Sequence, residues 1–227
     1  MERKKIVITG SNGVIGSILR GHLQEYKITP MDLPEVDVRE YDKLLQIFPG
    51  HDGIIHLAWD KKTENFRSGK INPDNSSMTC NVYRAAVETG VPRVIMASSV
   101  HADSYSKWEG PGLLKPDRIP VPDSPYGASK LFMEALGRHY AQDYGLEVVC
   151  IRFGGINLRD RVNPENKDSK VWLSQRDCVS LIKKCLEVSQ IPNNYEIIYA
   201  ISKNSNRTHD YSNSLGWEPK DDVLNKK

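Results

Sequence analysis

The sequence of 227 residues has no long apolar run and no excess of charge of one sign. No stretch approaches the ~18 apolar residues of a membrane-spanning helix, which argues against a membrane partner. The 31 Lys and Arg residues against 29 Asp and Glu residues leave a net charge of +2, so nucleic acid is not expected as the main partner. The apolar run Ile6–Ile8 is too short for a secretory signal, and we expect a cytoplasmic protein.

Paired cysteines are missing as well. Cys80, Cys150, Cys178 and Cys185 form no Cys-x-x-Cys motif, so the sequence predicts neither a metal site nor a redox motif but four reduced thiols. With 39% hydrophobic and 26% charged residues, the composition is that of an ordinary globular protein. It excludes a disulfide mini-protein, a collagen-like chain and a wholly disordered chain.

Short β-branched runs alternate with helical patterns along the chain. Apolar residues recur every three to four positions from Ile15 to Tyr26, and again before Gly90. This alternation predicts an α/β fold in which a doubly wound parallel sheet carries helices on both faces. The expected strands are Ile6–Thr9, Lys27–Asp32, Val36–Val38, Gly53–Leu57, Val94–Ala97, Val148–Arg152 and Glu196–Tyr199.

Two features of this strand assignment are unusual. Pro30 falls inside the second expected strand, although proline removes a donor from the ladder. It should therefore lie at a bulge or a strand end, or else the strand boundary is shifted. The run Val36–Val38 follows so closely that no helix is expected between the second and third strands.

A glycine-rich turn joins the first expected strand to the first helix. Gly10 permits a tight turn, Gly13 lets the backbone approach a pyrophosphate, and Gly16 lets the helix pack closely on the strand. Free N–H groups at the helix N-terminus would bind the phosphates. The pattern predicts a Rossmann-type dinucleotide site, although a plain strand–turn–helix corner would share its spacing. The candidate residues are Gly10, Asn12, Gly13, Val14, Ile15 and Gly16.

Asp32 ends the second expected strand, 16 residues after Gly16. A carboxylate there can accept hydrogen bonds from both hydroxyls of the adenosine ribose, and it would repel a 2′-phosphate. Because the next residue, Leu33, offers no compensating base, we expect NAD rather than NADP. The alternative is that Asp32 is an ordinary turn aspartate with no role in binding. Asp37 and Val38 are expected near the adenine.

A second motif lies in the middle of the chain. Asp123 or Ser124 can cap a helix in which Pro125 takes the first position. Tyr126 and Lys130 then share one face, and an ammonium near the phenol should lower the tyrosine pKa toward that of a usable general base. A buried-type strand that ends in Ser98 and Ser99 would bring a hydroxyl to the same edge of the sheet.

Taken together, these motifs resemble the extended short-chain dehydrogenases/reductases, in their NAD-dependent epimerase/dehydratase branch. The resemblance implies that Ser99, Tyr126 and Lys130 form a catalytic triad and that Leu57 and Ala58 line the cofactor. Later segments are similar to those of uronate dehydrogenases and archaeal-type sugar dehydrogenases. The matching pieces are Thr9–Gly16, Asp32, Asp37–Val38, His56–Ala58, Asn81, Ser98–Ser99, Tyr126 and Lys130, followed by Ser98–His101, Trp172–Cys178 and Leu215–Asp222.

Two loops rich in basic residues should open beside Ser99. We hypothesise that they attract a carboxylate or a phosphate of the substrate, although solvated charged loops would look the same. The substrate candidates are Lys61, Arg161 and His101, the last of which follows Ser99 by two residues. The basic residues are Lys61, Lys62, Arg67 and Lys70 in the first loop and Arg159, Arg161, Lys167 and Lys170 in the second.

The leading functional hypothesis is an NAD-dependent oxidoreductase that transfers a hydride between nicotinamide and a small sugar such as a uronate, an aldose or a sugar phosphate. One domain over residues 1–227 is expected, with 155–227 contributing a small substrate cap, and this favours a small sugar over a nucleotide sugar. The alternatives are an NAD-retaining nucleotide-sugar epimerase or dehydratase and a non-catalytic cofactor-binding interaction protein. A homodimer through the Tyr126 helix is a further expectation.

Overall fold

Six parallel strands form one sheet in the order β2-β1-β3-β4-β5-β6 in the computed structural model, which describes residues 2–103, 108, 110 and 112–224. The order reverses between β1 and β3, since the chain first builds outward to β2 and then returns across β1. The strands are β1 (Lys5–Thr9), β2 (Lys27–Met31), β3 (Gly53–His56), β4 (Arg93–Ser99), β5 (Glu147–Phe153) and β6 (Tyr195–Ala200).

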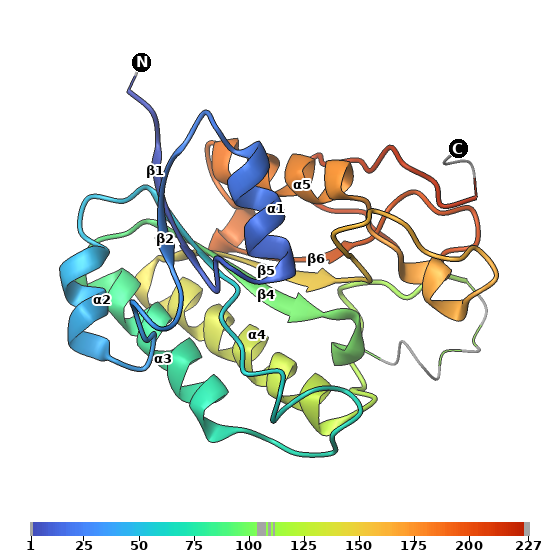
Figure 1. The fold of residues 1–227 in the computed structure, drawn as a ribbon, viewed down its shortest axis with the longest axis horizontal. Helices are drawn as coiled ribbons and strands as arrows, with labels where there is room; N and C mark the ends of the chain where they lie inside the picture. Colours follow the sequence, from blue (N-terminus) through green and yellow to red (C-terminus); the bar gives the residue numbers. More distant parts are fainter. Residues whose placement is uncertain (1, 104–107, 109, 111, 225–227) are drawn as a thin grey trace.

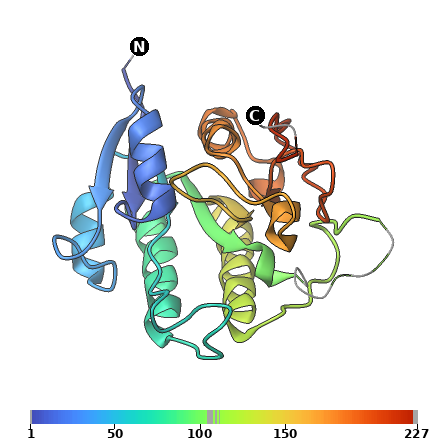
Figure 2. The ribbon, with the colours of Figure 1, turned by 45° about the vertical axis from the view of Figure 1, so that its right-hand side comes forward.

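Helices cover both faces of this sheet (Figure 1), as the sequence predicts. On one face, α1 and α5 pack against each other, and on the other α3 contacts both α2 and α4 (Figure 2). The helices are α1 (Val14–His22), α2 (Tyr41–Ile47), α3 (Pro73–Glu88), α4 (Pro125–Tyr144) and α5 (Gln175–Glu187). The predicted doubly wound α/β fold is therefore confirmed.

The segment between β2 and β3 differs from the prediction. Val36–Val38 is not a strand, and the helix α2, which had not been assigned from the sequence, lies between this segment and β3. The backbone groups of this segment are used within turns: the Val36 N–H donates to the Asp32 carbonyl, and the Asp37 carbonyl accepts from Glu40. Groups bonded within turns are not available to a neighbouring strand, so this segment does not extend the sheet.

Pro30 lies inside β2, opposite Ile8 of β1, and it is exposed. Because β2 is the first strand in the sheet order, one of its sides has no neighbouring strand among the described residues. Lys27 donates its N–H to Lys4, and N–H groups alternate sides along a strand, so the Pro30 nitrogen faces away from β1. The proline is tolerated because it stands at an outward position of an edge strand.

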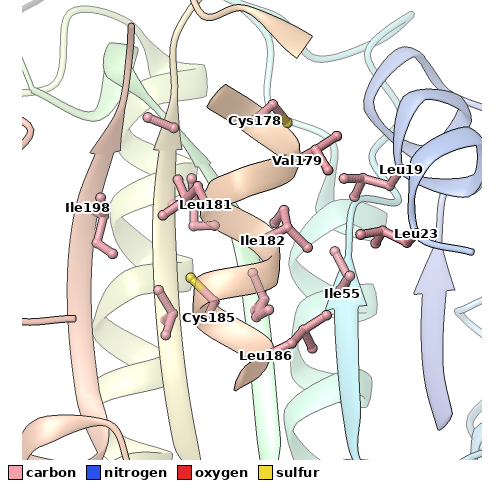
Figure 3. Packing of buried hydrophobic residues seen from close by; sticks show 14 of the residues in the cluster. Leu19, Leu23, Ile55, Cys178, Val179, Leu181, Ile182, Cys185, Leu186 and Ile198 are labelled. Atoms are coloured by element: carbon pink, nitrogen blue, oxygen red, sulfur yellow. The ribbon is translucent and has the colours of Figure 1, made fainter. Parts of the chain in front are cut away.

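The core between α5, α1 and the sheet is built from aliphatic side chains and buried thiols. Figure 3 shows Ile182 of α5 beside Leu23 of α1, and Leu186 of α5 beside Ile55 of β3. All four cysteines are free, and burial raises the pKa of the Cys178 and Cys185 thiols to about 12. No helix among the described residues is long and apolar enough to cross a membrane.

The segment 155–224 contributes to both the sheet and one helical layer. Its strand β6 is the last strand in the sheet order, and its helix α5 packs against α1. The short 3₁₀ helix Lys167–Val171 follows a loop that returns to the carboxyl edge, where the Gly155 N–H donates a hydrogen bond to the Val171 carbonyl.

Candidate active site

A cleft of about 1110 Å³ opens at the carboxyl ends of the central strands. It crosses the point between β1 and β3 where the strand order reverses, which is where open α/β sheets bind their ligands. One end is formed by the glycine-rich turn and Asp32, and the other by Ser99, Tyr126 and Lys130. The structure thus brings the two predicted motifs into one continuous cleft.

The glycine-rich turn is closely packed where each glycine was expected to matter. Gly10 has a φ of +65°, and a Cβ there would lie 2.7 Å from the Ala58 nitrogen. A Cβ on Gly16 would lie 2.6 Å from the Gly10 carbonyl oxygen. Gly13 caps α1 and lines the cleft. Bare backbone thus faces the cleft at the start of a helix, and this cradle fits the pyrophosphate of a dinucleotide; Asn12, Val14 and Ile15 complete the lining of the turn.

Asp32 is held at the adenosine end of the cleft by backbone donors. Its carboxylate accepts hydrogen bonds from the Asn12 N–H at 2.7 Å and the Leu33 N–H at 2.9 Å. Nearby, Asp37 forms an ion pair with Arg39, which lowers the pKa of the Asp37 carboxyl, and Arg39 also reaches Asp74.

Arg39 lines this end of the cleft together with Asp37 and Val38. Only the residue directly after Asp32 was considered from the sequence as a site for a base that could bind a 2′-phosphate. Arg39 was therefore missed. Its charge is matched by the carboxylates of Asp37 and Asp74.

The exit of β3 is joined to β1 through side chains. Thr9 and His56 share a hydrogen bond of 2.7 Å between Oγ1 and Nδ1, and the Leu57 N–H donates to the Thr9 carbonyl. Burial and the charge of Lys130 lower the pKa of His56 to about 3, so this imidazole is neutral. Leu57 and Ala58 line the cleft as predicted, whereas His56 lies behind them.

The helix α4 begins as predicted and places the tyrosine and lysine. The Ser124 Oγ accepts a hydrogen bond from the Gly127 N–H at 3.2 Å, and Pro125 takes the first helical position. The Ser99 Oγ at the end of β4 accepts from the His101 N–H. Ser99, Tyr126 and Lys130 all line the cleft.

The structure does not show the predicted lowering of the Tyr126 pKa by Lys130. Burial raises the pKa of Tyr126 to about 12, and a hydrogen bond with Ser99 acts in the opposite direction. Lys130 instead donates to the Ala97 carbonyl at 2.9 Å, and burial lowers its own pKa to about 7. The expected lowering of the tyrosine pKa by the ammonium is therefore wrong for this arrangement, in which Ser99 is the group that favours the phenolate.

Behind these residues lies a buried network of charged groups. The Ser98 hydroxyl donates to Glu134, whose carboxylate forms a two-pronged ion pair with Arg152. Arg152 also donates to Tyr199, and Tyr199 donates to Asp103. The network joins β4, α4, β5 and β6 beneath the site, and a buried charged group is stabilised only when it is paired in this way.

Of the substrate candidates, His101 is the most firmly held. Its Nδ1 lies 2.9 Å from the Asp123 carboxylate, and its ring stacks on Phe66 with 4.3 Å between the ring centroids. His101 and Lys61 both line the cleft. Arg161 is exposed and does not belong to the lining, whereas Lys167 from the same loop does.

Sequence reasoning missed Trp59 and the role of Glu64. Trp59 lies three residues after β3 and lines the cleft. Glu64 is fully buried, although it lies in the loop that carries Lys61, Lys62, Arg67 and Lys70. A signal in the sequence was the position of this tryptophan, directly after His56-Leu57-Ala58 at the end of an expected strand. Among the described residues, no cluster of three or more His, Cys, Asp or Glu side chains could hold a metal.

The fold and the site together define a dinucleotide-binding enzyme with a serine, a tyrosine and a lysine at its reactive end. The model of the NAD dependent epimerase/dehydratase family matches residues 6–200. The chain belongs to this family, which confirms the predicted family, the enzyme class and the NAD cofactor.

Several relatives are similar over nearly the whole chain. An L-arabinose 1-dehydrogenase (NAD(P)(+)) from Haloferax volcanii is 30% identical over 96% of this chain and 96% of its own length. An NAD-dependent glucose-6-phosphate dehydrogenase from the same organism is 29% identical, covering 95% and 93%. A uronate dehydrogenase mutant from Agrobacterium tumefaciens complexed with NAD superimposes with a TM-score of 0.82 at 26% identity, covering 97% of this chain and 86% of that one.

Proposed function

We propose that the protein is an NAD-dependent dehydrogenase that oxidises the anomeric hydroxyl of a small anionic sugar to a lactone. The observation that carries the proposal is the single cleft that joins the glycine-rich turn to Ser99, Tyr126 and Lys130. Among the curated relatives that match nearly the full chain, three act on arabinose, glucose 6-phosphate and uronates, as their names state.

In this reaction bound NAD would supply the acceptor for the hydride that leaves the sugar carbon. Tyr126 takes the proton of the sugar hydroxyl, and Ser99 orients that hydroxyl and stabilises the phenolate through its hydrogen bond. Lys130 lies one helical turn from Tyr126, where its ammonium can bind the nicotinamide ribose. Holding the reacting groups in one cleft supplies much of the rate.

Basic residues support the anionic character of the substrate. Lys61, Lys62 and Arg67 line the cleft from the loop after β3, and Lys167 lines it from the loop after β5. The first loop also holds two acidic residues. Glu64 is buried and bonded to Asn72 and Asn75, whereas Asp60 lines the cleft, so three basic residues of this loop face the cleft against one carboxylate. A carboxylate or a phosphate would be attracted to this end.

The loop that leads to Lys167–Val171 acts in this proposal as the substrate cap within a single domain, because Ile156, Lys167 and Asp168 line the cleft. Four free thiols support a cytoplasmic location. A homodimer through α3 and α4 stays a prediction, supported by the 42% exposure of Phe132 on α4.

The second candidate is an NAD-retaining nucleotide-sugar epimerase. A GDP-mannose 3,5-epimerase from Oryza sativa is 30% identical, but the match covers only 68% of this chain and 47% of that protein. Two dehydrogenases from Haloferax volcanii are matched over 96% and 93% of their own length, which favours net oxidation. The presence of Tyr126 and Lys130 argues against a non-catalytic binding protein.

The test is a substrate screen that follows reduction of NAD by absorbance. Uronic acids, neutral aldoses and sugar phosphates are compared, with NADP in parallel. We expect reduction of NAD with an anionic sugar and a lower KM than for its neutral counterpart. Tightly bound NAD that survives purification, without net reduction by any sugar, would favour the epimerase instead.

A further inference from the structure

Trp59 lies against the lysine of the active site. The Lys130 Nζ is 3.5 Å from the centroid of the Trp59 ring, well within the range of a cation–π contact. The edge of the same ring meets Tyr126, with 5.8 Å between the ring centroids and an angle of 81° between the planes. One side chain therefore touches both members of the Tyr-x-x-x-Lys motif.

The indole is fixed from behind by its own loop. Its Nε1 donates to the Glu64 carbonyl at 3.3 Å. The buried Glu64 carboxylate accepts from the Asn72 N–H and from the Asn75 side chain at the start of α3, each at 2.9 Å. Asp60 adds bonds to the Lys62 N–H and to the Asn72 side chain. Trp59 is thus held by a loop anchored to α3.

The surroundings of Lys130 show why such a contact matters. Its side chain is buried, and its ammonium donates to the Ala97 carbonyl of β4. The charged and titratable groups that face it are Glu64 from the loop after β3, Glu134 and Tyr126 from α4, and His56 from β3. A buried ammonium needs compensation for lost hydration, and the negative face of an indole supplies it without a second charge.

We propose that Trp59 is a positioning residue for Lys130, its ring face holding the ammonium at the end of β4 and keeping it charged within the cleft. Lys130 stays fixed beside Tyr126 because two elements contact it: the loop after β3 through Trp59, and β4 through Ala97. The loop therefore contributes to the reaction centre as well as to the substrate end of the cleft.

The test is an NMR titration of Lys130 in protein labelled with ¹⁵N at the lysine side chains, without cofactor or sugar. The Lys130 signal is assigned by its loss in Lys130→Arg. In Trp59→Leu the site stays apolar but loses the π face, so the ammonium should be less stable. We expect the Lys130 pKa to be lower by roughly one unit, which is a tenfold change in the protonation equilibrium constant. Trp59→Phe keeps a π face and should lie between this variant and the wild type.

Phe66→Leu is the matched control, because Phe66 lies in the same loop but stacks on His101. It should leave the titration of Lys130 unchanged. A Lys130 pKa in Trp59→Leu equal to or above the wild-type value would overturn the proposal, even if the KM for a sugar rises. The proposal rests on the role given to Lys130, but the titration uses neither sugar nor NAD, so it stands or falls separately from the substrate assignment.

Discussion

Tyr126 is the residue on which the proposed proton transfer depends. Replacing it with phenylalanine removes the hydroxyl but keeps the ring that meets Trp59. We expect kcat to fall by about 10²- to 10⁴-fold, since this is the range that a positioned general base contributes. The measurement is steady-state reduction of NAD by the best sugar from the screen.

Binding of NAD to Tyr126→Phe, measured by calorimetry, should stay within a few-fold of the wild type. The rate of the wild-type enzyme should rise with pH above neutrality, because burial raises the Tyr126 pKa to about 12 and the phenolate forms only as pH increases. An active Tyr126→Phe variant would contradict the assignment.

Asp32 controls the choice of cofactor in our interpretation. Asp32→Asn keeps an oxygen that can accept the Asn12 N–H but removes the negative charge. The ratio of kcat/KM for NAD over NADP should fall by roughly 10- to 100-fold, as expected for loss of a charged hydrogen-bond acceptor. Asp42→Asn, on α2 and outside the cleft lining, should leave this ratio unchanged. A strong wild-type preference for NADP would show that Arg39 outweighs Asp32.

Residues whose type follows from local chemistry could be predicted from the sequence. Gly10 and Gly16 have no space for a Cβ, and Ser124 and Pro125 are bonded or placed as a helix start requires. The direction of the Tyr126 pKa could not be predicted, because it depends on burial and on the choice of Ala97 as the partner of Lys130. Trp59 was missed for a similar reason, since its contacts come from an element distant in sequence.

Helices and strands with strong periodicity or clear caps could also be predicted from the sequence. Elements with a weak sequence signal could not. Six of the seven expected strands agree with the sheet to within a few residues, and α4 begins after Ser124 as expected. The helix α2 has only 7 residues and no side-chain cap, so its signal was weak. Val36–Val38 carried β-branched residues but is bonded into turns, which its composition does not reveal.

The contact between α3 and α4 depends on Gly137. A Cβ at this position would overlap the hydroxyl of buried Tyr83 on α3 and meet Val148 of β5 at 3.0 Å. Gly137→Ala should therefore lower the free energy of unfolding by about 1 to 3 kcal/mol, despite the better helix propensity of alanine. Urea denaturation followed by circular dichroism measures this change.

Gly21 on α1 is the matched control for this helix substitution. It has nothing within 4 Å of its ideal Cβ, so Gly21→Ala should raise the free energy of unfolding by about 0.5 to 1 kcal/mol. A stabilising Gly137→Ala would show that the two helices can separate without cost.

The folded molecule as a whole should lose stability in acid. Burial lowers the pKa values of His56 and His209 to about 3, against about 6.5 in an unfolded chain. Between these values the unfolded chain binds more protons, so the free energy of unfolding falls as pH drops from about 6.5 to about 3. Each histidine contributes a slope of up to about 1.4 kcal/mol per pH unit.

Denaturation curves at several pH values test this expectation. His209→Gln should reduce the slope by about one proton relative to the wild type. An unchanged slope in His209→Gln would contradict the role given to this histidine in the acid sensitivity.

The edge position of Pro30 has a consequence for how copies of the protein meet. An unpaired strand edge can add a strand from another molecule, and each added strand needs donors along that edge. The outward positions of β2 are Ile28 and Pro30, and the second of these has no N–H to give. Pro30 thus disfavours association of two molecules through this edge, because a strand added beside β2 can receive a hydrogen bond from Ile28 but not from Pro30.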